Sequence, residues 1–241
     1  MTNTLELIFN MNSNKKTARI AGLLYLVVVL SGIFSLAYVP GKLFVHNDAS
    51  ATFHNITTSE TLFRFGILGS VICYTFFLIL PLVLYKLLRS VDKTFAQSMV
   101  VLAVVSVPVS FINLLNKFAV LTLISKAGYL KVFEADKLQA QVLLHLQAYN
   151  NGNQIASIFW GLWLFPFGYL VFKSGILPKI LGILLMAGCF GYLIAFTGKL
   201  LIPGYNEMAI SDFVTLPASL GEIGTCLWLL IMGAKEKQVS A

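Results

Sequence analysis

Six stretches of this chain are each long enough and apolar enough to cross a lipid bilayer as a helix. A hydrocarbon layer about 30 Å thick takes about 20 helical residues to cross. Because 58% of the 241 residues are hydrophobic and only 11% are charged, a soluble core could not hide the apolar side chains. The sequence therefore predicts an all-α, polytopic bundle with six transmembrane spans, at 20–39, 62–88, 95–124, 154–172, 180–201 and 213–232.

One membrane domain, at 20–233, accounts for most of the chain, between an N-terminal segment at 1–19 and a tail at 234–241. The basic lead before the first span also resembles a signal peptide. However, the apolar run exceeds the usual 7–15 residues of a signal peptide and no A-x-A cleavage site follows, so we expect a retained helix. Pro40-Gly41 is expected to close this span before a polar loop at 42–61.

The longest interruption lies between the third and fourth spans, at 125–153. Within it, Leu138, Val142, Leu146 and Tyr149 recur at helical spacing. This pattern predicts either an amphipathic helix at the membrane interface or an extension of the next span. The Asn150-Asn151-Gly152-Asn153 segment is expected to break the helix.

The distribution of basic residues predicts the orientation. One side of the predicted bundle, which has both termini and the short turns, carries ten of them: Lys15, Lys16, Arg19, Lys86, Arg89, Lys93, Lys173, Lys179, Lys235 and Lys237. The other side carries six: Lys42, Arg64, Lys126, Lys131, Lys137 and Lys199. Because short cytoplasmic loops are enriched in Lys and Arg, both termini are predicted to be cytoplasmic, in a bacterial inner membrane.

Glu222 is the most costly side chain of the predicted spans, because it lies near the middle of the sixth. An ionised carboxylate at bilayer depth costs at least about 2.5 kcal/mol. Glu222 should therefore face the protein interior and either find a partner or stay protonated. It is a candidate proton, cation or ligand site, and the alternative is a structural hydrogen bond between helices.

Lys117 is the natural counter-charge, and it lies in the third span with Asn113 and Asn116. Asn113 precedes Lys117 by four residues and shares its helix face, whereas Asn116 lies to one side. A direct Lys117–Glu222 pair is one expectation. The other is that Lys117 extends to the outer interface, with its ammonium in water.

Further polar residues fall in the outer half of the predicted bundle. Arg64 begins the second span, where it either extends to the interface or turns inward, and Asn153 and Gln154 begin the fourth. The sequence thus predicts an outward-opening polar cavity bounded by spans two, three, four and six. Its candidate residues are Glu222, Lys117, Asn113, Asn116, Arg64, Asn153 and Gln154.

Other functional classes find little support. His46, Asp48 and His54 match no closed metal-site spacing, and the sequence contains no catalytic motif or cofactor fingerprint. The formal charge of +7 comes from residues at span ends, not from a basic face with exposed aromatics, which argues against nucleic acid.

Membrane lipids are the expected partners. Ala187, Gly191 and Ala195 form a small-residue face, suited to internal packing or to a second copy of the chain.

Several strings resemble the bacterial family known as domain of unknown function 4386. They are Lys16-Thr17-Ala18-Arg19-Ile20-Ala21-Gly22-Leu23-Leu24-Tyr25, Phe63-Arg64-Phe65-Gly66, Asn113-Leu114-Leu115-Asn116, Gly168-Tyr169-Leu170-Val171-Phe172-Lys173-Ser174-Gly175 and Gly221-Glu222-Ile223. Members often carry an acidic residue shortly after the Phe-Arg pair, where this chain has Gly69-Ser70. The resemblance covers most of 15–233 and implies the same membrane topology, with no established activity or cofactor.

Three hypotheses follow from the sequence. The first is a membrane protein that binds or passes a small ligand or ion through the polar cavity around Glu222. The second is a structural or partner-binding membrane subunit without a ligand of its own. The third, an intramembrane enzyme, is the least favoured because no nucleophile and base are paired.

Overall fold

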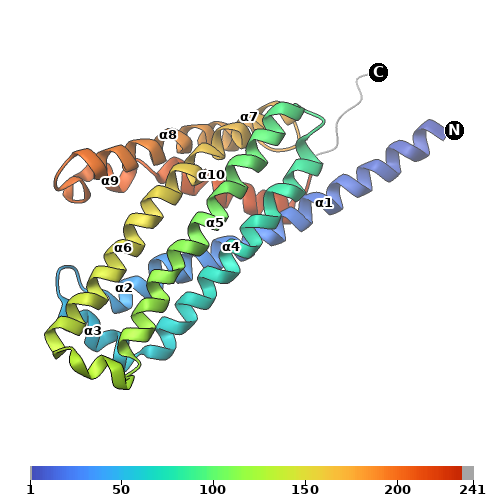
Figure 1. The fold of residues 1–241 in the computed structure, drawn as a ribbon. Helices are drawn as coiled ribbons and strands as arrows, with labels where there is room; N and C mark the ends of the chain where they lie inside the picture. Colours follow the sequence, from blue (N-terminus) through green and yellow to red (C-terminus); the bar gives the residue numbers. More distant parts are fainter. Residues whose placement is uncertain (1, 235–241) are drawn as a thin grey trace. The chain divides into compact units, whose positions relative to one another are not determined.

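The computed structural model describes residues 2–234, and their side chains from Asn14 onward (Figure 1). Residues 235–241 of the predicted tail lie outside the described residues. The secondary structure of the described part consists of helices joined by short connections. In chain order the elements are α1 (Thr2–Gly32), the π-helical turn η1 (Ile33–Tyr38), α2 (Val39–Leu43), α3 (Ala49–Thr58), α4 (Glu60–Leu88), α5 (Lys93–Ile124), the 3-10 turn η2 (Gly128–Val132), α6 (Ala135–Leu162), α7 (Leu164–Ser174), α8 (Lys179–Leu201), the 3-10 turn η3 (Tyr205–Glu207), α9 (Ala209–Phe213) and α10 (Leu216–Ile231).

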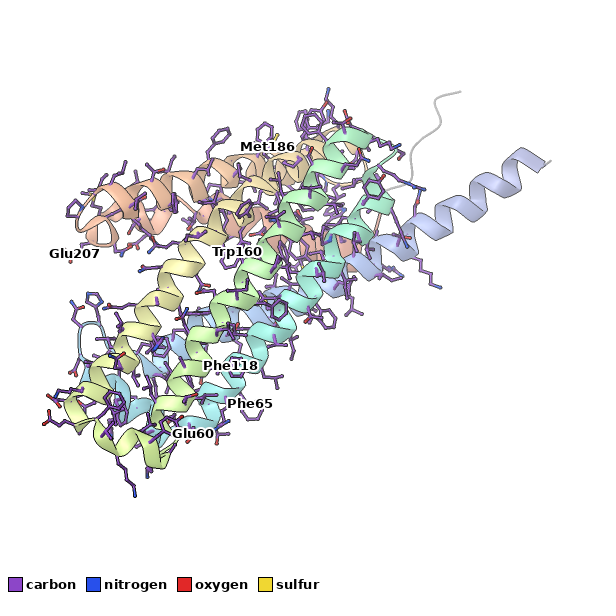
Figure 2. The ribbon with its side chains drawn as sticks, in the orientation of Figure 1. Glu60, Phe65, Phe118, Trp160, Met186 and Glu207 are labelled. Carbon is purple, nitrogen blue, oxygen red and sulfur yellow. The ribbon has the colours of Figure 1, made fainter. Side chains whose placement is uncertain are left out.

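Six helical segments among the described residues are long and apolar enough to cross a membrane: Asn14–Leu43, Glu60–Leu88, Lys93–Ile124, Ala135–Ser174, Lys179–Leu201 and Ala209–Ile231. Large apolar side chains such as Phe65 and Phe118 lie exposed on these segments (Figure 2). That exposure is the arrangement expected where lipid is the solvent. The predicted all-α class with six spans is confirmed, and the orientation of the termini stays a prediction.

Two expectations around the first loop are wrong. Pro40-Gly41 does not close the first span, because both residues lie in α2, where Pro40 occupies the first turn and needs no N–H partner. The segment expected to be a polar loop contains α3, a helix of ten residues. Asp48 begins α3 by accepting a hydrogen bond from the Ala51 N–H at 2.8 Å, as a helix N-cap does.

The expected break at Asn150–Asn153 is also wrong, because α6 runs through these residues without interruption. The helical spacing before them is therefore the start of the fourth span, which was one of the two alternatives. The break falls instead at Trp163, between α6 and α7. Pro166 explains this position, since a proline lacks the N–H for the helical bond and clashes with the carbonyl four residues earlier, which belongs to Leu162.

The chain divides into two compact units. Among the described residues, unit 1 comprises 2–27, 76–106 and 157–234, and unit 2 comprises 28–75 and 107–156. The helices α1, α4, α5 and α6 each contribute to both units.

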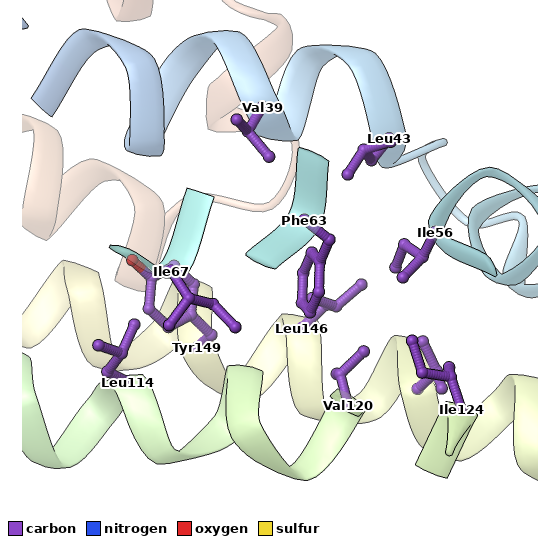
Figure 3. Close-up of a cluster of buried hydrophobic side chains, with 11 residues drawn as sticks. Val39, Leu43, Ile56, Phe63, Ile67, Leu114, Val120, Ile124, Leu146 and Tyr149 are labelled. Atoms are coloured by element: carbon purple, nitrogen blue, oxygen red, sulfur yellow. The ribbon is translucent and has the colours of Figure 1, made fainter. Parts of the chain in front are cut away.

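Unit 2 encloses a hydrophobic cluster formed by η1–α2, α3, α4, α5 and α6 (Figure 3). Its buried members are Val39, Leu43, Ile56, Phe63, Ile67, Leu114, Val120, Ile124, Val142, Leu146 and Tyr149. Tyr149 lies beside Ile67 and Leu114 in this cluster (Figure 3). Three of the four apolar residues that recur at helical spacing at the start of α6, namely Val142, Leu146 and Tyr149, therefore form its buried face, and Leu138 is half-buried.

Unit 1 is held together by close helix packing and by stacked aromatic rings. Helix α8 lies alongside α7 and α10 (Figure 1). A Cβ atom on Gly188 would lie 2.6 Å from the Cα atom of Ala218, so α8 and α10 are in backbone contact. Gly191 likewise packs against Val214, which makes this part of the small-residue face internal to unit 1, whereas Ala187 is exposed.

Candidate functional site

A lysine is buried in unit 2. The side chain of Lys117, on α5, is 1% exposed, although long cationic side chains are almost never fully buried without a partner. Its ammonium donates a long hydrogen bond of 3.5 Å to the backbone carbonyl of Ser35, and it lies 4.2 Å from the centre of the Tyr149 ring. The expectation that Lys117 extends to the interface is therefore wrong, because its side chain is turned into the protein.

The Ser35 carbonyl comes from the π-helical turn η1. Single π turns inside α-helices recur at functional sites, because they change the local pattern of backbone hydrogen bonds. The Ser35 hydroxyl is buried and has no hydrogen-bond partner among the described residues. A buried hydroxyl of this kind has an unused donor and an unused acceptor, and it belongs to the residue whose carbonyl meets Lys117.

Amide side chains form the second part of the site. Asn113, one turn before Lys117 on α5, donates to the Tyr149 carbonyl at 2.8 Å and to Asn153 Oδ1 at 3.0 Å. Asn116 donates to the Asn113 carbonyl at 3.1 Å, and its Oδ1 lies 3.3 Å from His145 Nδ1. The structure therefore brings four predicted residues together: Asn113, Asn116, Lys117 and Asn153.

Two tyrosines complete the site, and sequence reasoning missed both. The hydroxyls of Tyr74, on α4, and Tyr149, on α6, lie 3.3 Å apart, and both side chains are buried. Ser70 also lies close to the Tyr149 hydroxyl. Four segments of unit 2, namely η1, α4, α5 and α6, thus direct polar groups to the surroundings of Lys117, which we call the Lys117 site.

The Lys117 site holds a basic side chain that is in neither of the ion pairs found among the described residues. Among the described residues, the recorded ion pairs are Arg64–Glu60 at 2.7 Å and Lys137–Glu134 at 2.9 Å, and neither includes Lys117. An ammonium has three donors, and here its partners are the distant Ser35 carbonyl and the Tyr149 side chain. The hydroxyls and amides around it are polar groups that can bind an anion or a polar ligand.

Glu222 has its partner in unit 1. The Tyr25 hydroxyl, on α1, donates to Glu222 Oε1 at 3.0 Å, and Glu222 as a whole is half-buried. Glycine makes this contact possible, since a Cβ atom on Gly22 would lie 2.7 Å from the Leu230 Cα atom. The Cys226 thiol also donates to the Gly22 carbonyl at 3.7 Å. Helices α1 and α10 therefore touch along their backbones, and Tyr25 meets Glu222 one turn further along.

The remaining predicted residues lie elsewhere. Arg64 is exposed and pairs with Glu60, labelled in Figure 2, so it does not join the buried cluster. Gln154 follows Asn153 on α6 and is partly exposed. Lys117 and Glu222 belong to different units, and each has contacts within its own unit. The single cavity that was predicted to join all seven residues stays a prediction.

The described side chains include no group of three or more His, Cys, Asp or Glu residues placed to hold a metal ion. Asp48 caps α3. The three cysteines, Cys73, Cys189 and Cys226, are free and buried.

Residues 20–233 match the family described as Domain of unknown function (DUF4386). The chain belongs to the DUF4386 family. The match includes both polar sites, because it begins before Tyr25 and ends after Glu222. The resemblance deduced from the sequence strings is thereby confirmed, and the family description states no activity.

This DUF4386 protein is also similar to an uncharacterised protein of Archaeoglobus fulgidus. The two are 36% identical over 95 residues, which is 39% of this chain and 54% of the relative. The chain thus matches about half the length of that relative. No solved structure matches this DUF4386 protein.

Proposed function

We propose that this DUF4386 protein binds a small anionic ligand within the bacterial inner membrane, and that Lys117 supplies the charge that holds it. The burial of Lys117 carries the proposal: the side chain is 1% exposed on a segment that can cross a membrane, with no carboxylate partner among the described residues.

The cost of burying a cation supports an anionic ligand over a neutral one. An ammonium at bilayer depth costs at least about 2.5 kcal/mol, and an uncompensated buried charge is strongly destabilising. The ring of Tyr149 offsets part of this cost through a cation–π interaction. A carboxylate or phosphate would offset far more, because it provides both the opposite charge and acceptors for the remaining ammonium protons.

The hydroxyl and amide groups of the site suit the same ligand. The free hydroxyl of Ser35 and the paired hydroxyls of Tyr74 and Tyr149 can donate to an oxyanion. Asn113 and Asn153 hold α5 and α6 together beside them, through the 3.0 Å bond between their side chains. The site therefore has a fixed frame and, at Ser35, a hydroxyl without a partner.

Glu222 has a different role in this account. Its hydrogen bond with Tyr25 joins α1 to α10 near the point where the two backbones touch at Gly22 and Leu230. That contact favours the structural alternative for Glu222, as an interhelical hydrogen bond inside the membrane. The ligand site is accordingly centred on Lys117, and not on Glu222 as the sequence suggested.

The proposal is tested with purified protein in a neutral detergent. The melting temperature is measured against a panel of small carboxylates and phosphates, for the native protein, for Lys117→Met and for Lys137→Met. The control variant, Lys137→Met, removes the same charge from an exposed position, where the ion pair with Glu134 contributes little to stability.

At least one anion is expected to raise the melting temperature of the native protein and of Lys137→Met, and to leave that of Lys117→Met unchanged. Without any anion, Lys117→Met should be at least as stable as the native protein, because a costly charge has been removed. An anion response that survives in Lys117→Met would refute the proposal. So would a loss of stability in this variant, without anion, that matches a core deletion.

A further inference from the structure

We propose that a groove in unit 1 binds one anionic phospholipid, independently of the Lys117 site. The groove is open to the surface and has a volume of about 540 Å³. Its lining consists of residues of α1 and one residue of α10: Lys15, Lys16, Arg19, Ile20, Leu23 and Leu230.

The charge of the groove calls for an anion. Lys15, Lys16 and Arg19 are all exposed, and the ion pairs recorded for the described residues include none of them. Lys15 and Arg19 are four residues apart on a helix, where like charges destabilise each other. A phosphate group between these side chains would replace that repulsion with charge-assisted hydrogen bonds.

The order of side chains along the groove matches that of a phospholipid. Lys16, Ile20 and Leu23 follow one another at spacings of four and three residues, so they lie on one face of α1. At 1.5 Å per residue, the groove changes from basic to apolar within about 12 Å. Leu230 of α10 supplies a second apolar wall. A lipid phosphate would thus meet the basic end, and the start of an acyl chain would follow the apolar walls.

The packing of α1 against α10 fixes the shape of the groove. Gly233, with φ of +70°, ends α10 in a left-handed turn, and a Cβ atom there would lie 3.0 Å from Lys15 Cγ. One α10 turn earlier, Leu230 lies against Gly22. Because both walls come from helices in backbone contact, the groove is a built feature and not a gap between mobile side chains.

A second basic cluster distinguishes a lipid site from general attraction to an anionic surface. Lys86, Arg89 and Lys93, at the turn between α4 and α5, carry the same three charges and are also exposed, but they do not line the groove. General attraction depends on charge and treats both clusters alike. A bound lipid depends on the groove.

The test measures the apparent affinity for phosphatidylglycerol, added to the full-length protein in a neutral detergent and detected by native mass spectrometry. Phosphatidylcholine and inorganic phosphate serve as a zwitterionic lipid and a free anion. One variant carries Lys15→Gln, Lys16→Gln and Arg19→Gln. Its matched control carries Lys86→Gln, Arg89→Gln and Lys93→Gln.

The groove variant is expected to bind phosphatidylglycerol about a hundredfold more weakly, since each basic residue contributes about a factor of five. The control variant should change by less than about threefold, and phosphatidylcholine should bind weakly throughout. Equal losses in the two variants would overturn the proposal and leave only general attraction. Melting temperatures equal to that of the native protein show that both variants are folded.

The apolar wall supplies a second test. Leu23→Gln should weaken phosphatidylglycerol binding severalfold, whereas Leu30→Gln, an equally exposed change on α1 outside the groove, should not. Inorganic phosphate is expected to compete poorly, because it has no acyl chain. If phosphate displaces the lipid fully and Leu23→Gln has no effect, the groove is a phosphate site and the lipid proposal fails.

Discussion

The ammonium of Lys117 lies over the ring of Tyr149, with 4.2 Å between the nitrogen and the ring centre. Tyr149 thus makes two separate contacts, because its hydroxyl lies 3.3 Å from that of Tyr74. The ring belongs to the hydrophobic cluster of unit 2, and the hydroxyl belongs to the Lys117 site. The contacts of the hydroxyl can be removed while the ring is kept.

Tyr149→Phe keeps the ring and removes the hydroxyl. It should therefore lower the free energy of unfolding by about 1 kcal/mol, the usual contribution of one hydrogen bond. Tyr149→Leu also removes the cation–π contact, and its cost should be larger by at least about 1 kcal/mol. Thermal unfolding in detergent measures both. In a Lys117→Met background, the difference between the two variants should shrink, and an unchanged difference would show that the ring does not stabilise the ammonium.

Gly152→Ala should disturb the Lys117 site through Asn113, without any change to Lys117 itself. A Cβ atom on Gly152 would overlap the Oδ1 and Cγ atoms of the Asn113 amide. Asn113 must then move and lose its bonds to Tyr149 and Asn153. The free energy of unfolding should fall by about 1–2 kcal/mol, and the anion should raise the melting temperature by less than in the native protein.

Gly128→Ala is the matched control for Gly152→Ala, because no atom lies within 4 Å of a Cβ atom there. Its melting temperature and its anion response should equal those of the native protein. If Gly152→Ala behaves like this control in both measurements, Asn113 does not hold the site in the way described.

The hydrogen bond between Tyr25 and Glu222 is expected to appear as a coupling free energy. Tyr25→Phe, Glu222→Met and the double variant form a cycle in which each change removes the hydrogen bond, and interhelical hydrogen bonds in membranes contribute about 0.6–1.7 kcal/mol. Unfolding of the four proteins should give a coupling in this range. Glu222→Gln should keep the full anion-induced rise in melting temperature. Loss of that rise would show that Glu222 is part of the ligand site.

Gly22→Ala should be among the most destabilising small changes in unit 1. Its Cβ atom would meet the backbone of Leu229 and Leu230, which cannot move aside as a side chain can. Overpacking of this kind costs about 1–3 kcal/mol. Gly41→Ala, where no atom lies within 4 Å, should change stability little. Equal melting temperatures for the two variants would contradict the close contact between α1 and α10.

Hydropathy was sufficient to predict the six spans. Because exposing backbone and polar groups to lipid is costly, each span must by itself be a long apolar helix, and such a segment can be read from the sequence alone. It failed at Asn150–Asn153, where residues that disfavour helices lie within α6. Asn153 accepts a hydrogen bond from Asn113, so its side chain is engaged by another helix and does not compete for the backbone. Such tertiary contacts override local propensity and are invisible in one sequence.

The candidate site was predictable in part for the same reason. Lys117 and Asn113 are costly in a span and share a helix face, so the sequence alone marked both. Tyr149 and Ser35 gave no such signal. Tyr149 falls on the apolar face of α6, and serine is common in spans, so only the packing of α6 and η1 against α5 reveals their contacts with Lys117.

The charge of Lys117 can be observed directly by ¹⁵N NMR of side-chain-labelled lysine in lipid bilayers, with Lys117→Met to assign the signal. The spectrum is recorded with and without the anion that stabilises the protein most. The account predicts an ammonium signal for Lys117 in the presence of that anion, at a position that changes when the anion is removed. A Lys117 signal that is identical in both samples would contradict the central claim that this lysine binds an anion.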